Sequence, residues 1–372
     1  TQGFFDFIPQ ALQISPQEKM KKILFSLLAL LSTSLTAQTE VTEYQPGITE
    51  DGITYFLPST ALRFTITATC TTYTPGEYCR YAQRYLRLKE VPQTAFKVWK
   101  ITGVKATPFG IADKKQAYSI KLKNKTLAPL VSLSADGRLL SVNGNVEVTE
   151  DILPSARVIA DTTKFLNPTD YKTEEILAAG SIAKMAELTA NEIYDIRENR
   201  SLLTKGQADF MPKDGQQLKL MLNQLDTQEN ALLQLFRGTK KTDTHVFTLD
   251  YVPDSETKGE ILFRFSKHLG LVKNDNVAGE PYTIEVKDLK ALPNVETISK
   301  PKDKKVEDLR YTVPGKGEII LRHNGQEVYK STLPMAQFGR VEHLGGDLFN
   351  KKSTTRVYLS PSTGAITKIE GE

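Results

Sequence analysis

The hydrophobic period changes twice along this chain, and this change constrains the fold more than any other feature. Residues 38–150 and 239–372 alternate apolar and polar side chains, which is the period of half-buried strands. Residues 173–238 instead carry an apolar stripe with the period of an amphipathic helix. We therefore predict an α+β fold with two antiparallel β-rich, sandwich-like domains and a long antiparallel helical hairpin between them. Residues 151–172 are the expected linker.

Two helices are expected within residues 173–238. Thr173 is predicted to cap the first, which ends at Lys205-Gly206, and Asp214 to cap the second, which ends at Arg237-Gly238. The inner stripe of the first helix is mostly alanine and that of the second is mostly leucine, which suits close antiparallel packing. A second apolar face on the first helix should also be covered, by the β domains or by another molecule: Ile182, Met185, Leu188 and Ile196.

The two β-rich regions contain strong turn signals. Asp136-Gly137 and Asn324-Gly325 each lie between alternating segments and predict tight hairpins. Val131–Leu133 and Val357–Leu359 resemble each other in sequence and in the glycine that follows. This echo indicates either a duplication or the convergence of two hairpins on one pattern.

Residues 20–37 have the plan of a secretory signal peptide. Met20-Lys21-Lys22 precedes a short apolar run, which ends in small and polar residues. This run is too short to anchor the chain across a bilayer. We therefore expect export, to the periplasm or the exterior of a Gram-negative cell, with cleavage near Ala37. Residues 1–19 precede this signal and are interpreted as a start-site artefact, with an amphipathic extension as the alternative.

The overall charge argues against one class of partner. A formal charge of +4, spread over 372 residues, is too weak to predict nucleic-acid binding. The lysine-rich stretch 300–305 contains a proline and an acid, and is typical of a solvated linker. No transmembrane span is expected.

Cys70 and Cys79 are the only cysteines of the chain. Strict alternation over residues 62–70 predicts a strand that ends at Cys70, while residues 74–77 resemble a capping box that opens a helix with Cys79 on its apolar side. An even cysteine count in an oxidising compartment favours a disulfide, so we predict a structural Cys70–Cys79 bridge. Such a short loop would stabilise the fold by about 2.5–3 kcal/mol. A redox pair and two free thiols are the alternatives.

No coherent catalytic set is recognised. Ser181 and Lys184 match a serine–lysine motif, but Ser181 is expected inside a helix and the companion motifs are missing. His245 follows the apolar face of a strand, and His323 is expected to be exposed. Glu342-His343, beside Gly345-Gly346-Asp347, forms the one acid–histidine cluster and lacks metal-ligand spacing.

Asn274-Asp275-Asn276 could offer oxygen ligands to calcium, but is more typical of a plain turn. We therefore assign no catalytic, cofactor-binding or metal-ligating residue and expect no cofactor. Paired carboxylates cannot be recognised without a fold, so a glycosidase stays open.

Several segments together carry a resemblance to a known family: Thr54–Pro58, Tyr73–Tyr78, Tyr81–Leu86 and Pro212–Gly215. With the export signal, they resemble an uncharacterised family of secreted Bacteroidetes proteins, classed as a domain of unknown function. The resemblance implies an envelope or secreted location and transfers no catalytic residue. The leading hypothesis is a non-enzymatic binding or structural module with a protein or glycan partner in the cell envelope. The alternative is a periplasmic hydrolase that acts on glycan or peptide.

Overall fold

The computed structural model describes residues 48–49, 52–120, 131–146, 153–292, 309–344 and 355–371. All of them belong to one compact unit, Gln45–Glu372. The predicted signal peptide at 20–37, the segment before it, and the lysine-rich stretch 300–305 lie outside the described residues. None of the described helices is long and apolar enough to span a bilayer.

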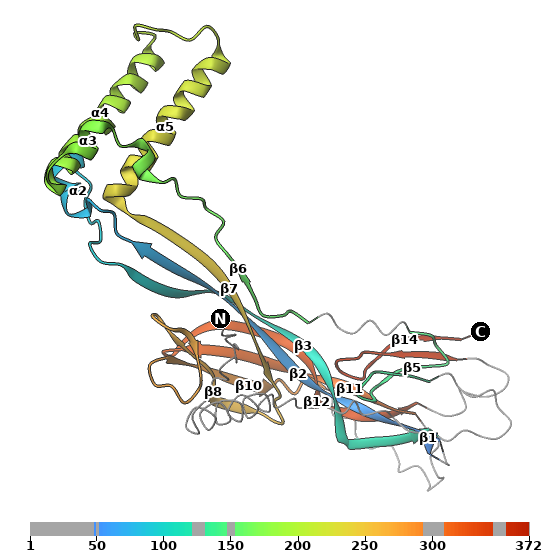
Figure 1. Ribbon diagram of the computed structural model, residues 1–372. Coiled ribbons are helices and arrows are strands. Elements are labelled where there is room, and N and C mark those ends of the chain that lie inside the picture. Colours follow the sequence, from blue (N-terminus) through green and yellow to red (C-terminus); the bar gives the residue numbers. More distant parts are fainter. Residues whose placement is uncertain are drawn as a thin grey trace, which may run out of the picture. The chain divides into compact units, whose positions relative to one another are not determined.

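The longest strands belong to sheet A (Figure 1). Its central strand β2 (Gly52–Thr74) pairs antiparallel with β3 (Phe96–Ile120) along one side and with β7 (Thr239–Tyr251) along the other. The short strands β1 (Ile48–Thr49) and β6 (Arg157–Ile159) pair with β2 and β7. Threonine and other β-branched side chains are frequent in β2, which favours this long extended conformation.

Sheet C packs against sheet A and forms a sandwich. It runs in the order β12 (Gln326–Leu344), β11 (Leu309–His323), β10 (Glu280–Asp288), β8 (Thr257–Ser266) and β9 (Gly270–Val272). Between the sheets lies the sandwich core, in which Phe64 and Ile66 of β2 contact residues such as Phe263 and Ile284. The predicted Asn324-Gly325 hairpin joins β11 to β12, with both residues at positive φ.

Sheet B combines strands from both ends of the chain. Its order is β14 (Ile366–Glu370), β13 (Arg356–Leu359), β5 (Leu139–Val142) and β4 (Val131–Leu133). The two segments that echo each other in sequence therefore lie in one sheet, where Val357 pairs with Val142. A third core, which contains Tyr55, Leu57 and Leu139, joins this sheet to β2 and β11.

The structure thus differs from the expected division into two β-rich domains. Strands from residues 38–150 and 239–372 share sheets A and B instead of forming separate sandwiches. Strands as short as β4, β5 and β13 cannot hold a sheet alone, and pairing across the chain supplies the neighbours that they need.

A buried polar junction connects sheet A to the other strands. Thr60 of β2 is fully buried; its hydroxyl donates to the carbonyl of Ser362 at 3.0 Å and accepts from the backbone N–H of Ala336 at 2.9 Å. The Gln337 amide donates to the carbonyls of Thr60 and Pro253 and accepts from the Thr60 N–H. Every buried polar group named here has a partner, as stability of a buried polar cluster requires.

The helices lie between β2 and β3 and between β6 and β7. The first insertion holds a 3₁₀ turn, Cys79–Tyr81, and α2 (Ala82–Leu86). The second holds another 3₁₀ turn, Pro168–Tyr171, followed by α3 (Glu174–Ala178), α4 (Ile182–Lys205) and α5 (Gly215–Arg237). The predicted caps Thr173 and Asp214 and the predicted stops at Gly206 and Gly238 are confirmed.

The first predicted helix is interrupted. Ala179 and Gly180 separate α3 from α4, and Ser181 caps α4 by accepting from the Lys184 N–H at 3.3 Å. A glycine followed by a good capping residue favours a new helix start over a continuous helix.

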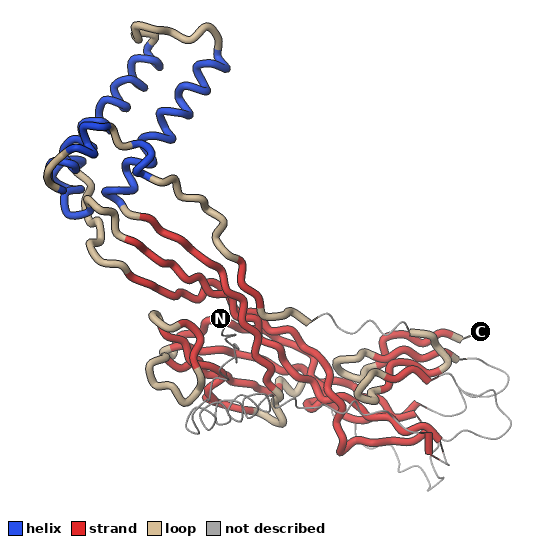
Figure 2. Tube along the Cα trace, viewed as in Figure 1, coloured by secondary structure: helices blue, strands red, loops and turns tan. Residues whose placement is uncertain are grey.

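α4 and α5 run side by side (Figures 1 and 2) and share the helical core with the first insertion. In this core, Ala186, Ala190 and Ile193 of α4 meet large side chains of α5 and residues of α2: Leu232, Leu235, Phe236, Ala82 and Leu86. The small residues of α4 let the bulkier side chains approach closely, as the sequence indicates.

The second apolar face of α4 has a different cover from the one expected. Ile196 is buried and Met185 packs on the helical core, next to α2 rather than against a β domain. Ile182 stays 53% exposed. The helical core that these residues join also contains residues of the β2–β3 connection, such as Tyr78 and Leu86, which lie about a hundred positions earlier in the chain.

The predicted disulfide is not formed: Cys70 and Cys79 are free thiols. β2 does not end at Cys70 but continues to Thr74, which carries the chain about 13 Å onward at the usual rise of a strand. A disulfide requires the two Cα atoms within about 7 Å.

The chain beyond Thr74 is then held at the end of α5. The Tyr78 N–H donates to the Leu235 carbonyl at 2.7 Å, and a Cβ on Gly76 would lie 2.2 Å from the same oxygen. Glu77 pairs with Lys172 instead of completing a capping box, so the helix starts only at Cys79.

Candidate functional site

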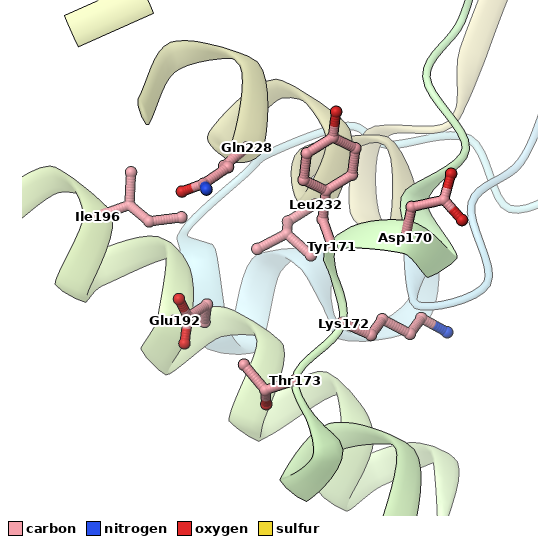
Figure 3. A pocket seen from close by; sticks show the side chains of 8 residues that line it. All are labelled: Asp170, Tyr171, Lys172, Thr173, Glu192, Ile196, Gln228 and Leu232. Carbon is pink, nitrogen blue, oxygen red and sulfur yellow. The ribbon is translucent and has the colours of Figure 1, made fainter. Parts of the chain in front are cut away.

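The best candidate site is a hollow on the helical region, defined here as residues 75–95 and 160–238 (Figure 3). Its volume is about 250 Å³. The segment that contains the 3₁₀ turn 168–171 forms one wall, and α4 and α5 form the other. The lining residues are Asp170, Tyr171, Lys172, Thr173, Glu192, Ile196, Gln228 and Leu232.

Local capping builds the first wall. The Asn167 side chain accepts from the Thr169 N–H at 3.2 Å and Pro168 occupies the first position of the turn, so residues 168–171 close into one 3₁₀ turn. Thr173 then caps α3 by accepting from the Ile176 N–H at 3.4 Å. Two caps in close succession fix the backbone of the segment between them, which carries Tyr171 and Lys172.

Helical spacing builds the second wall. Glu192 and Ile196 lie one turn apart on α4, and Gln228 and Leu232 lie one turn apart on α5. Ile196 and Leu232 are buried and belong to the helical core, so the bottom of the hollow is apolar and well supported. Glu192, Gln228 and Tyr171 are half-buried at its rim.

Lys172 is already committed to another contact. Its ammonium lies 2.9 Å from the Glu77 carboxylate and 5.2 Å from the centroid of the Tyr78 ring. Burial lowers the pKa of Lys172, but the Tyr78 hydroxyl and the Glu77 carboxylate outweigh it and raise that pKa above its usual value. The lysine is therefore a permanent cation that holds the 3₁₀ turn to the first insertion.

The two acids of the hollow do not converge. In Figure 3, the carboxylates of Asp170 and Glu192 lie on opposite sides of the Tyr171–Thr173 segment, and Lys172 extends away from Glu192. Asp170 accepts a hydrogen bond from the Asn167 side chain at 2.9 Å. Among the described residues, Glu192 makes no ion pair with any side chain. A glycosidase needs two carboxylates that flank one bond, and this arrangement does not provide them.

A buried ion cluster fixes α4 against α5 beyond the hollow. Glu229 accepts from Arg197 at 2.7 Å and from Arg200 at 2.6 Å, and Arg200 also contacts Asp226. Burial raises the pKa of Glu229, but the two arginines outweigh this effect and hold the pKa below its usual value. The charges of these arginines are thus balanced by Glu229 and Asp226, and neither arginine pairs with Glu192.

Comparison with known proteins gives one family match. A family described as "Domain of unknown function (DUF4831)" matches residues 51–367. The chain belongs to this family. No curated protein matches the chain, and no solved structure matches it.

The match includes strands of all three sheets and all the described helices, and of the described elements it leaves out only β1 and the end of β14. The resemblance inferred from Thr54–Pro58 and the other segments is confirmed at the level of this family.

The serine–lysine motif lies at a helix start, contrary to expectation, yet it does not form an acyl-enzyme site. Ser181 uses its hydroxyl to cap α4, and the Lys184 ammonium pairs with Glu187 at 2.9 Å on the surface. Neither residue lines the hollow.

The histidines lie apart from the hollow. His245 stacks near Trp99, with ring centroids 4.5 Å apart, on the apolar side of β7, as its alternation predicts. His323 is not freely exposed: it stacks on Tyr282 at 4.2 Å and lies 2.9 Å from Glu280.

Glu342 and His343 do not act as a pair. As neighbours on β12 they point to opposite faces, so Glu342 contacts Tyr311 and Arg340 while His343 contacts Arg310. Residues 345–347, which completed that candidate cluster, lie outside the described residues.

Asn274-Asp275-Asn276 forms a turn between β9 and β10. The Asn274 carbonyl accepts from Arg264 at 2.9 Å, and the Asn276 side chain accepts from the Ala278 N–H. Within the described parts of the chain, no cluster of histidine, cysteine and acidic side chains could hold a metal ion.

The residues of the hollow were not recognised as a site in the sequence. Asp170, Tyr171 and Lys172 fall in the segment predicted to be a linker. Glu192 falls outside the predicted inner stripe of α4, whereas Gln228 belongs to the predicted inner stripe of α5 and was read there as a packing residue. One local signal was available: Asn167-Pro168 is a cap followed by proline at a first helical position, which predicts an ordered turn rather than a linker. The juxtaposition with α4 and α5 has no local signal.

Proposed function

We propose that this chain is an exported protein of a Gram-negative cell envelope that binds a partner rather than transforming it. In this proposal, α4 and α5 act as one helical hairpin that carries the binding surface, and the β-sheets support it. Export rests on the signal-peptide pattern of residues 20–37.

The observation that carries the binding function is the composition of the hollow. Its bottom is apolar and packed in the helical core, and its lining combines one aromatic ring, one amide and two carboxylates, of Asp170 and Glu192, that have no ionic partner among the described residues. Apolar support with a few directed polar groups is typical of a recognition site. Its size, about 250 Å³, suits a side chain or a single sugar unit rather than a large ligand.

Site-specific cross-linking in cells tests this function. A photoreactive phenylalanine derivative in place of Gln228, on the rim, should capture an envelope protein or glycan. The same replacement at Gln224, one turn earlier on α5 and exposed, should capture much less. Equal capture at both positions, or none at either, would contradict the proposal that the hollow is the binding site.

Export and hydrolysis are tested separately. Cell fractionation with N-terminal sequencing should find the chain in the envelope fraction, beginning near Gln38. Incubation of the purified chain with envelope glycan and peptides should release no soluble fragments. Fragment release that disappears in a Glu192→Gln variant would replace the binding function by the hydrolase alternative.

A further inference from the structure

We propose that the hollow between the 3₁₀ turn 168–171 and helices α4 and α5 binds an ammonium group at the end of an aliphatic stem, as in a lysine side chain of a partner protein. The proposal rests on the binding function above and adds the chemical class of the ligand. Four features of the hollow carry it.

The first feature is the charge balance. Each described cation near the hollow has an acidic partner within the chain: Lys172 has Glu77, Lys184 has Glu187, and Arg197 and Arg200 share Glu229. Glu192, which is half-buried, and Asp170, which accepts only from the neutral Asn167 amide, have none among the described residues. The uncompensated charge at the hollow is therefore negative, and complementarity favours a cationic ligand.

The second feature is the direction of the acids and of the lysine. The Lys172 ammonium lies on the side opposite Glu192 and therefore does not neutralise it (Figure 3). An incoming cation would consequently meet Glu192 without first displacing an existing ion pair.

The third feature is the aromatic wall. Tyr171 is half-buried and packs on the helical core beside Leu232, so its position is supported by packing. An aromatic face attracts ammonium groups by about 0.5–2 kcal/mol, depending on how far the pair is desolvated. The chain already uses this contact nearby, where the Lys172 ammonium lies over the ring of Tyr78.

The fourth feature is the apolar bottom. Ile196 and Leu232 close the bottom of the hollow with alkyl groups, of which only 3% and 1% is exposed, so they exclude water below an aliphatic stem but add little contact area. Lysine-type side chains combine an apolar stem with a charged end, which matches this order of surfaces. Gln228 supplies a carbonyl oxygen that can accept one further N–H of the ammonium group.

Saturation-transfer NMR with the purified chain tests the ligand class. Nα-acetyl-lysine amide should receive saturation along its side-chain methylene groups, and the effect should weaken as salt is raised. Nα-acetyl-norleucine amide, which lacks the ammonium group, should bind about tenfold more weakly, the ratio that corresponds to loss of one hydrogen bond to a charged group of about 1.4 kcal/mol. Equal binding of the two amides would overturn the proposal.

Variants connect the binding to the hollow. Glu192→Gln should lower the affinity for the lysine amide about tenfold, whereas Glu198→Gln, an exposed acid on the same helix outside the hollow, should leave it unchanged. Because Glu192 has no ionic partner, its replacement should not unfold α4, and circular dichroism checks this. Unchanged affinity in Glu192→Gln would contradict the proposal.

Two ligands distinguish a lysine of a partner protein from a small free amine. A lysine-containing peptide that binds more tightly than n-pentylamine supports a partner protein, whereas the reverse order would contradict the commitment to a protein lysine. If cross-linking at Gln228 captures a partner while the lysine amide shows no saturation transfer, the ligand class is wrong and the binding function stands. If cross-linking at Gln228 also captures nothing, both the ligand class and the binding function are contradicted.

Discussion

The sandwich core and the helical core are stabilised by different kinds of contact. The sandwich core consists of large apolar side chains from strands far apart in sequence, such as Phe64, Phe263 and Ile284. The helical core contains alanines and is extended by an ion cluster around Glu229. The comparison shows that the β part depends mainly on buried apolar area, whereas the helical part depends also on charges that respond to pH and salt.

The sandwich also has the higher share of non-local pairing. β2 pairs with β3 and β7 over most of its length, while α4 and α5, which are joined by residues 206–214, make their backbone hydrogen bonds locally. We therefore expect the helical region to open with less free energy than the sandwich, as a separate cooperative unit.

The largest expected effect comes from truncating one side chain in each core. Phe64→Ala and Phe236→Ala should each cost about 3–5 kcal/mol, because both rings are fully buried. Phe64→Ala should accelerate amide exchange throughout the sandwich, whereas Phe236→Ala should accelerate it first in α4 and α5. Hydrogen-exchange mass spectrometry measures this, and identical protection patterns in the two variants would show that the cores unfold as one.

The ion cluster should make the helical region sensitive to acid. Glu229→Gln leaves Arg197 and Arg200 without their main acceptor and should cost about 2 kcal/mol, less than for a fully buried pair because both arginines are partly exposed. Asp226→Asn, at an exposed acid of the same cluster, should cost much less. Chemical denaturation followed by helix content compares the two variants.

The direction of the pH effect follows from the Glu229 pKa. That pKa is lowered in the folded protein, so the stabilisation is complete above the unfolded value of about 4.3 and is lost as the pH falls through the folded value. Protection factors of helix-region amides, which are corrected for the intrinsic pH dependence of exchange, should therefore fall below about pH 4, before those of the sandwich. Glu229→Gln already lacks this stabilisation at neutral pH, so the same drop in pH should weaken its helical region less; an equal acid response in the variant and in the unmodified chain would contradict the assignment to Glu229.

An effect of similar size is expected at the polar junction that connects the sheets. Thr60→Val removes the hydroxyl that satisfies Ser362 and Ala336 and should destabilise the sandwich by about 1–3 kcal/mol. Thr102→Val, an exposed threonine on β3, serves as the control and should change little. Thermal melting distinguishes them, and equal melting temperatures would show that the junction contributes no stability.

The smallest effect on stability concerns the thiols, which the structure leaves free. Without any reductant, a maleimide should label half-buried Cys79 before Cys70, whose side chain is only 2% exposed. Both should react once the chain is unfolded in urea. A thiol count that rises only after reduction would contradict the free pair.

The hydrophobic periods and the caps were determined by the sequence itself. Thr173, Asp214, Gly206 and Gly238 mark helix ends as predicted, because capping depends on residues within one turn of each other. The strand-rich character of the flanking regions and the Asn324-Gly325 hairpin follow from equally local patterns. The break at Gly180 was within reach of the same reasoning, since glycine and a capping serine both lie at the boundary.

Only the tertiary structure decided which strands share a sheet and what the helices enclose. Alternation specifies that a strand has a buried face, but not which distant strand pairs with it, so the pairing of β5 with β13 and of β2 with β7 has no local signal. The length of β2 past Cys70 depends on its pairing with β7, which is why the predicted disulfide was wrong. The hollow depends on the same long-range order: Tyr171 and Glu192 become neighbours because the 3₁₀ turn, α4 and α5 pack on one core.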